Sequence, residues 1–296
     1  MTLHDMLKQI DIQGEDIKEL DELELQKLHA RLMTVIQDFS VFTEEHKIQW
    51  ALGAGNMLGA VRLNGFIPWD DDIDITMTRE EFNKLLKVFP KDDPKYYLRK
   101  PGDSGYILHY PRLYVRDTKF RSFMSTDEGD NGLYIDIFID ENAPNNIIVR
   151  KLHGVVCTVF LGLASASRVY YCRRNLKKYL KKDKKTNREF IIRLIPGCLL
   201  SVIPMERWMK WADNVFSLCK NTNSKYIVIP SGARHYFGEI YDRTKFCTYT
   251  FARYESIELP IPVDPNYYLT LRYGKDYMEP PKKGKRERRL LLEYEI

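Results

Sequence analysis

Four carboxylates fall within five positions of this sequence, in the stretch GFIPWDDDIDITM (65–77). They are Asp70, Asp71, Asp72 and Asp74. Side chains alternate between the two faces of a β-strand, so a strand over 73–77 puts Asp72 and Asp74 on one face and the isoleucines on the other. Carboxylates held this close repel each other strongly unless a cation neutralises them. The spacing therefore predicts a site for a divalent cation.

A second stretch with the same alternation, LYIDIFID (133–140), carries a third carboxylate. Its isoleucines face a core, which leaves Tyr134, Asp136, Phe138 and Asp140 on the other side. Mg²⁺ prefers carboxylate oxygens together with substrate phosphates. We predict that Asp72, Asp74 and Asp136 are metal ligands for Mg²⁺, or for Mn²⁺ in its place. Asp136 is also a candidate to accept a proton from an attacking hydroxyl.

A glycine-rich turn, GAGNMLG (53–59), follows a predicted buried strand over 47–55. Glycine lets backbone N–H groups approach a phosphate closely, so Gly55 and Asn56 are candidate phosphate-binding residues. Together with the three aspartates, this turn predicts a phosphoryl-transfer site. Three alternatives are a solvated acidic turn, a calcium loop over 70–81 and a phosphoryl-accepting aspartate. A calcium loop requires glycine at the sixth position, where this sequence has Ile75.

The order of the expected elements predicts an α+β fold. Apolar residues at helical spacing indicate a helix over 17–45, and the pattern T-R-E-E from Thr78 indicates the start of another. Further strands are expected over 106–118 and 133–140, giving a mixed sheet core with flanking helices. We expect one domain over 1–296. Its parts are an N-terminal helical segment (1–45), a catalytic sheet core (46–140), a mostly helical insertion (141–225) and a C-terminal segment that packs back on the core (226–296).

Composition narrows the cellular setting. The chain has 296 residues and a net charge of +5, a mild excess that predicts no nucleic-acid partner. Its five cysteines include no CxxC pair, which argues against a disulfide framework or a structural zinc site. The first twenty residues have no apolar signal core, so we expect a cytoplasmic protein.

Two apolar segments in the insertion flank a basic one. VVCTVFLGLASA (155–166) and FIIRLIPGCLLSVIP (190–204) are both shorter than the ~20 apolar residues of a membrane-spanning helix. Between them, residues 173–188 contain nine Lys or Arg. One interpretation is a solvated helix face. The other is a peripheral contact through 155–204 with anionic lipid at the inner face of the cell membrane.

The stretch MLGAVRLNGFIPWDDDIDITM resembles the signature of the LicD family, whose members carry close variants of LLGAxRxxGFIPWDDDxD. LYIDIFIDEN resembles the family's later strand with its D-I-F element, and residues 255–281 resemble its C-terminal block. The resemblance implies a nucleotidyltransferase-like fold, shared with fukutin-related proteins. It also implies a metal-dependent transfer of a substituted phosphate, such as phosphocholine, from a CDP-activated donor such as CDP-choline. The implied acceptor is a sugar hydroxyl of a cell-surface glycan, such as teichoic acid or lipopolysaccharide, or of its lipid-linked precursor, and CMP is released.

The same resemblance assigns roles to individual residues. Asp72 and Asp74 match the family's metal pair, and Asp136 matches its third carboxylate. Gly55 and Asn56 take the Gly-Thr/Ser positions of the phosphate-holding turn, where Asn56 is a departure from the family. Arg62 matches the arginine after L-G-A-V and is a candidate donor-phosphate contact. Glu255 takes the position of the glutamate in the family's F-E-G element.

Three further residues are candidates, two of which, Trp69 and Tyr134, lie close to the aspartates in sequence. Arg112 is a candidate phosphate contact, because a guanidinium fork fits phosphate oxygens. Trp69 and Tyr134 are candidates for an aromatic wall around a quaternary ammonium head group. Packing is the alternative role for Trp69. Two other functions stay open: a non-catalytic relative that binds glycan or membrane, and a nucleotidyltransferase that uses an NTP and releases pyrophosphate.

Overall fold

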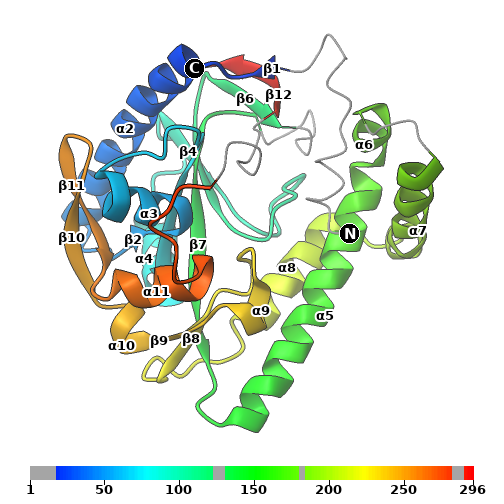
Figure 1. The fold of residues 1–296 in the computed structure, drawn as a ribbon. Coiled ribbons are helices and arrows are strands. Elements are labelled where there is room, and N and C mark those ends of the chain that lie inside the picture. The colour runs from blue at the N-terminus through cyan, green and yellow to red at the C-terminus, as the bar shows by residue number, and fades with distance from the viewer. Residues whose placement is uncertain (1–17, 123–130, 180–183, 282–289) are drawn as a thin grey trace.

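A mixed β-sheet that takes strands from both halves of the chain lies at the centre of the computed structural model (Figure 1). The structure describes residues 18–122, 131–179, 184–281 and 290–296. The described strands of this sheet run in the order β2 (Ala51–Leu52), β3 (Ile73–Thr78), β7 (Tyr134–Ala143), β5 (Arg112–Val115) and β4 (Tyr96–Arg99). β8 (Tyr226–Val228) pairs with the far end of β7, and β9 (Ile240–Asp242) pairs with β8. The sheet and its flanking helices confirm the α+β fold.

The pairing of β3 with β7 fixes the two acidic strands relative to each other. The strands run parallel, and Ile73, Asp74 and Ile75 stand opposite Ile135, Asp136 and Ile137 in turn. All four isoleucines have no exposed surface and belong to the main core. Because successive side chains alternate, Asp74 and Asp136 share the opposite face of the sheet.

Helices close the core on the side of the isoleucines. α2 (Glu22–Glu45) begins with a capping box, in which Asp21 and Glu24 each accept a backbone N–H of the other. α4 (Arg79–Val88) is capped by Thr78, which accepts from the N–H of Glu81. The Glu81 side chain instead accepts from Gln49, so only half of the box expected there forms. Further helices on the sheet are α3 (Ala54–Leu63) and α11 (Pro265–Tyr273).

Two of the expected strands are shorter than predicted. In the segment 47–55 only Ala51–Leu52 is strand, because Gly53 caps α3, which begins at the next residue. In the segment 106–118 the strand is limited to Arg112–Val115. Pro111, which has no N–H to donate to a neighbouring strand, stands directly before it. These lengths are corrections to the sequence-based expectation.

A layer of helices lies beside the sheet, at the right of Figure 1, and contributes to a second apolar core. It consists of α5 (Ile147–Tyr171), α6 (Arg173–Tyr179), α7 (Lys184–Leu200) and α8 (Met205–Phe216). Among the described helices, α5 is long and apolar enough to cross a membrane, judged by length and composition only. The expectation that the segment over 155–166 is too short is therefore wrong for the helix that contains it, because apolar residues from 147 onward extend it.

Small elements complete the chain. The C-terminal strand β12 (Leu290–Glu295) pairs with β6 (Lys119–Ser122) and with β1 (Lys18–Glu19). β10 (Tyr249–Tyr254) and β11 (Ile257–Pro262) form an antiparallel hairpin. The short helices α9 (His235–Gly238) and α10 (Arg243–Phe246) flank β9. Residues from this C-terminal part, including Tyr254 and Tyr268, join the main core.

Candidate functional site

The three predicted metal ligands lie together at the amino-terminal ends of β3 and β7. Asp72, Asp74 and Asp136 each offer a carboxylate oxygen, and these oxygens all lie within 4.8 Å of one another. Asp72 stands directly before β3, and Asp74 and Asp136 are register partners across the parallel pair. Asp72 and Asp136 are buried, and Asp74 is partly exposed. Side-chain alternation along each strand and the parallel register of β3 with β7 together bring these groups to one place.

The cluster holds its negative charges close together at an electrostatic cost. Burial, together with the charges of Asp72, Asp136 and Asp70, raises the pKa of Asp74 well above its ordinary value. Burial also raises the pKa of Asp136, although the neighbouring Arg112 acts in the opposite direction. Asp70, Asp71 and Asp72 form a second group within the same distance, which adds to the negative potential. This set of oxygen donors fits a hard divalent cation such as Mg²⁺.

The side chain of Asn56 binds backbone groups of both residues of the predicted metal pair, Asp72 and Asp74. Its Oδ1 accepts from the N–H of Asp74 at 2.6 Å, and its Nδ2 donates to the carbonyl of Asp72 at 3.1 Å. Nδ2 also donates to the hydroxyl of Tyr254 at 3.0 Å. Both of its N–H groups are thereby used within the protein. A phosphate contact at position 56 stays a prediction only for the backbone N–H, and the side chain acts as a positioning group.

The first turn of α3 lies against the acidic cluster. A Cβ built on Gly55 would come within 2.6 Å of Oδ2 of Asp70, so only glycine fits without displacing that carboxylate. The N–H groups of a first helical turn have no partners within the helix, and they attract anions. The first turn of α3 therefore lies beside the carboxylates with its backbone N–H groups at the helix start.

Arg112 lies opposite Asp136 in the sheet and is paired with it. Its Nε and Nη2 donate to the two oxygens of the Asp136 carboxylate, the second at 3.2 Å. The guanidinium also lies 3.5 Å from the centre of the Tyr134 ring. The donors of Arg112 are thus directed at Asp136, and one face of Tyr134 already carries a cation. The predicted roles of Arg112 toward phosphate and of Tyr134 toward a head group stay predictions that this geometry does not favour.

The remaining predicted residues make contacts outside the carboxylate cluster. Arg62 lies in the last turn of α3 and donates to the carbonyl of Tyr277 at 3.2 Å, which ties the C-terminal segment to the helix. Trp69 is partly buried against the main core, as expected of a packing residue. Oε1 of Glu255 accepts from the N–H of Phe66 at 3.0 Å and so holds the turn after α3.

Sequence reasoning missed two groups that the structure brings to the cluster. Arg272 of α11 lies near enough to Asp74 to lower the pKa of that carboxyl, and it pairs with the buried Glu239 at 3.0 Å. Tyr110 donates its hydroxyl to Asp136, which also favours the ionised carboxylate. The sequence feature that could have drawn attention to Arg272 is its position two residues before Gly274, the glycine that ends α11. Tyr110, one of 19 tyrosines, had no distinguishing signal.

Comparison with known proteins gives matches in the same region. Residues 47–153 match the family described as LicD/FKTN/FKRP, nucleotidyltransferase domain. The lipopolysaccharide cholinephosphotransferase LicD of Haemophilus influenzae is 28% identical over 127 residues, which cover 43% of this chain and 48% of that protein. An uncharacterized protein of Rickettsia prowazekii is 26% identical over 117 residues, or 39% of this chain and 41% of that protein. One of Rickettsia typhi is 28% identical over 93 residues, or 30% of this chain and 26% of that protein.

The chain thus spans about half the length, or less, of the curated relatives it matches. The family match includes Asp72, Asp74 and Asp136 but ends before the C-terminal block over 255–281, whose resemblance stays a prediction. The resemblance to the LicD family is therefore confirmed, and it lies in the nucleotidyltransferase domain at residues 47–153.

Proposed function

We propose that this chain transfers a substituted phosphate, of the phosphocholine type, from a CDP-activated donor to a sugar hydroxyl and releases CMP. The acceptor would be a cell-surface glycan such as lipopolysaccharide or teichoic acid, or its lipid-linked precursor. The observation that carries the proposal is the meeting of three aspartates beside the first turn of α3. It lies in the same stretch that matches the family of a named lipopolysaccharide cholinephosphotransferase.

The proposed cofactor is Mg²⁺, or Mn²⁺ in its place, held by Asp72, Asp74 and Asp136. Support comes from the raised pKa of Asp74, whose causes are burial and the negative charges of Asp72, Asp136 and Asp70. When bound, such an ion neutralises charge on the transferring phosphoryl group and on the leaving CMP.

The protein's own groups have distinct proposed tasks. The N–H groups of Gly55 and Asn56 would bind a phosphate of the donor, and the side chain of Asn56 holds Asp72 and Asp74 in register. Asp136 would take the proton of the attacking sugar hydroxyl as the new oxygen–phosphorus bond forms and the bond to CMP breaks. Its raised pKa suits a proton acceptor. The pairing with Arg112 keeps the carboxylate oriented.

Trp69 is the better-supported of the two head-group candidates, because it directly precedes the acidic cluster in the chain and is partly exposed. The identity of the head group would be tested with CDP-choline, CDP-ethanolamine, CDP-glycerol and CDP-ribitol in a thermal-shift assay with Mg²⁺. A true donor raises the unfolding temperature by mass action. We expect the protein to act in the cytoplasm without a nucleic-acid partner.

The direct test is Mg²⁺-dependent release of CMP from the donor that gives the largest shift. Asp74→Asn should abolish release, whereas Asp92→Asn, a matched change at an exposed aspartate outside the cluster, should leave it unchanged. Release of pyrophosphate from an NTP would assign the chain to the nucleotidyltransferases that use NTPs and would overturn the proposal. Glycan binding with no CMP release from any of the four donors would overturn it in favour of a non-catalytic relative.

A further inference from the structure

The apolar helix α5 leaves one of its sides uncovered. Exposed side chains on that side follow at steps of four, three and four residues, which is the spacing of one helical face. They are Ile148, Leu152, Val155 and Val159, each between 52% and 66% exposed. Only 28% of the most apolar window of this helix is buried. A core helix of a soluble protein is mostly buried, so α5 is not a core helix along its first half.

α7 covers the second half of the same side. A Cβ built on Gly197 would come within 2.4 Å of the carbonyl oxygen of Ala166, so the two helices cross closely at this point. At 3.6 residues per turn, Ala166 falls on the same side of α5 as Ile148 and Val155. α7 therefore lies on the outward side of α5, and its own outward side is opposite Gly197.

That outward side of α7 is also apolar and exposed. Its side chains follow at steps of three or four residues and continue just beyond the end of the helix. They are Ile192, Ile195, Leu199 and Val202, each between 55% and 84% exposed. We call these residues and the four on α5 the α5–α7 face. Figure 1 shows both helices at the margin of the molecule, away from β2 and α2.

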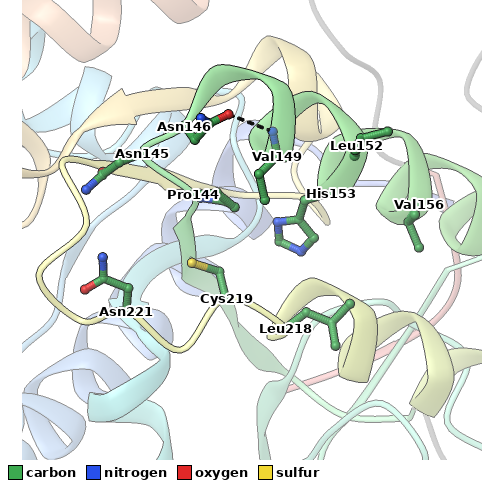
Figure 2. A pocket seen from close by; sticks show the side chains of 10 residues that line it. All are labelled: Pro144, Asn145, Asn146, Val149, Leu152, His153, Val156, Leu218, Cys219 and Asn221. Carbon is green, nitrogen blue, oxygen red and sulfur yellow. Dashed lines mark hydrogen bonds between the residues drawn. The ribbon is translucent and has the colours of Figure 1, made fainter.

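A groove of about 560 Å³ opens at the start of this face. Figure 2 shows Val149, Leu152 and Val156 of α5 on one side of it and Leu218 on the other, with His153 between them. The three predicted metal ligands do not line it. The groove is thus separate from the proposed catalytic site, and its apolar walls suit an acyl chain.

Basic side chains border the α5–α7 face. The stretch 173–188 contains nine Lys or Arg and a single Asp. Among its described residues, Arg174, Lys177, Lys184 and Arg188 are exposed. Arg188 stands four residues before Ile192, which places it on the same side of α7 as the apolar row. Apolar rows bordered by exposed cations are typical of helices that lie in the headgroup region of an anionic bilayer.

We propose that the α5–α7 face docks onto an anionic lipid bilayer, with its apolar rows at the acyl boundary and its cations against lipid phosphates. The charge of the bordering residues favours this occupant over a second copy of the chain, because two such basic borders would repel each other. Docking would hold the protein at the surface where lipid-linked molecules lie. It does not depend on the transferase reaction, since lipid binding is measured without donor or acceptor.

The first test changes the apolar rows. Full-length protein is floated with vesicles of phosphatidylcholine and phosphatidylglycerol, and with phosphatidylcholine alone. Leu199→Ser with Val202→Ser should reduce partitioning into the anionic vesicles at least about tenfold, given the worth of burying such side chains. The matched control, Leu23→Ser with Val41→Ser on α2, removes a leucine and a valine that are 68% and 57% exposed. It should leave partitioning unchanged.

The second test changes the charges. Arg174→Gln with Lys177→Gln on α6 should weaken partitioning about fivefold for each cation removed. Lys27→Gln with Arg31→Gln, an exposed pair on α2, is the matched control and should have no such effect. Circular dichroism would establish that each variant keeps the wild-type helix content, so that a loss of binding is not a loss of fold.

The other possible results of these experiments either overturn or support the proposal. Equal binding to neutral and anionic vesicles, or equal binding by the changed and control variants, would overturn the proposal. Membrane-bound protein that salt releases would support it. Resistance to both salt and alkaline carbonate would mean that α5 crosses the bilayer. A concentration-dependent dimer that Leu199→Ser with Val202→Ser abolishes, with no vesicle binding by wild type, would assign the face to a second copy. Either of these last two results would replace surface docking.

Discussion

Asn56→Ala tests whether a buried side chain with no proposed contact to the CDP donor or the sugar acceptor sets the geometry of Asp72 and Asp74. Asn56 is 1% exposed, and alanine removes its hydrogen bonds to the N–H of Asp74 and the carbonyl of Asp72. Each buried backbone group left without a partner costs about 1–3 kcal/mol. The hydroxyl of Tyr254 can rotate toward another acceptor and adds less. We therefore expect the free energy of unfolding to fall by about 2–6 kcal/mol.

The functional effect should exceed what instability alone produces. Asp72 and Asp74 would no longer be tied to α3, and a displacement of about 1 Å at a reacting centre can cost about a hundredfold in rate. We expect weaker Mg²⁺ binding, measured by titration calorimetry, and a lower kcat for CMP release. Both would be measured at a temperature where circular dichroism shows that the variant is fully folded.

The matched control is Asn214→Ala, an asparagine in another helix that is exposed to solvent. Its unfolding free energy in urea should stay within about 0.5 kcal/mol of wild type. If Asn56→Ala has the stability, the metal affinity and the kcat of wild type, then α3 and the preceding turn hold the aspartates without this side chain. The assignment of Asn56 as a positioning residue would then be wrong.

Three further predictions concern charge in the sheet. Asp74→Asn should make the metal-free protein more stable at neutral pH, because the raised pKa of Asp74 means that its ionisation opposes folding; urea unfolding in EDTA measures this, and a loss of stability would contradict it. Arg112→Gln removes the counterion of Asp136 at a place where the arginine side chain is only 11% exposed. The free energy of unfolding should therefore fall by about 3–5 kcal/mol, and Asp136→Asn in the same chain should restore part of that loss. Burial raises the pKa of Asp140 to about 7, so the folded state holds its proton where the unfolded state has lost it. Wild-type stability should therefore fall as the pH rises from the ordinary carboxylate pKa to about 7, and Asp140→Asn should flatten that fall in urea titrations at several pH values.

The arrangement of the acidic strands was predictable because it depends on a period of two. Because a strand that buries isoleucines on one face turns its aspartates to the other, a shift of one residue would place the charges in the apolar core. That is why Asp74 and Asp136 could be assigned to one face before the pairing of β3 with β7 was known. The long signature around Asp72 then indicated the resemblance to the LicD family, and the family match over 47–153 agrees with it.

The partners of these groups were not predictable in the same way. Whether Arg112 contacts a phosphate or Asp136 depends on the register between β5 and β7, which no local pattern encodes. Asn56 was assigned to a phosphate because glycines surround it, whereas its amide completes hydrogen bonds of a segment 16 to 18 residues away. The length of α5 was underestimated for a related reason. Its first turns are apolar yet exposed, and apolar content alone does not show where a helix begins.

The isoleucine face also explains how the fold brings carboxylates that repel one another close together. Four isoleucines with no exposed surface fix β3 against β7, and burying each stabilises the fold by roughly 1.5–3 kcal/mol. This contribution opposes the repulsion among the carboxylates, whose protonation equilibrium can also shift to relieve it. Asn56 and Arg112 then hold the acidic groups from the other side. The hydrophobic face therefore sets the geometry of the acidic cluster, because the register that buries the isoleucines is the same register that places Asp74 opposite Asp136.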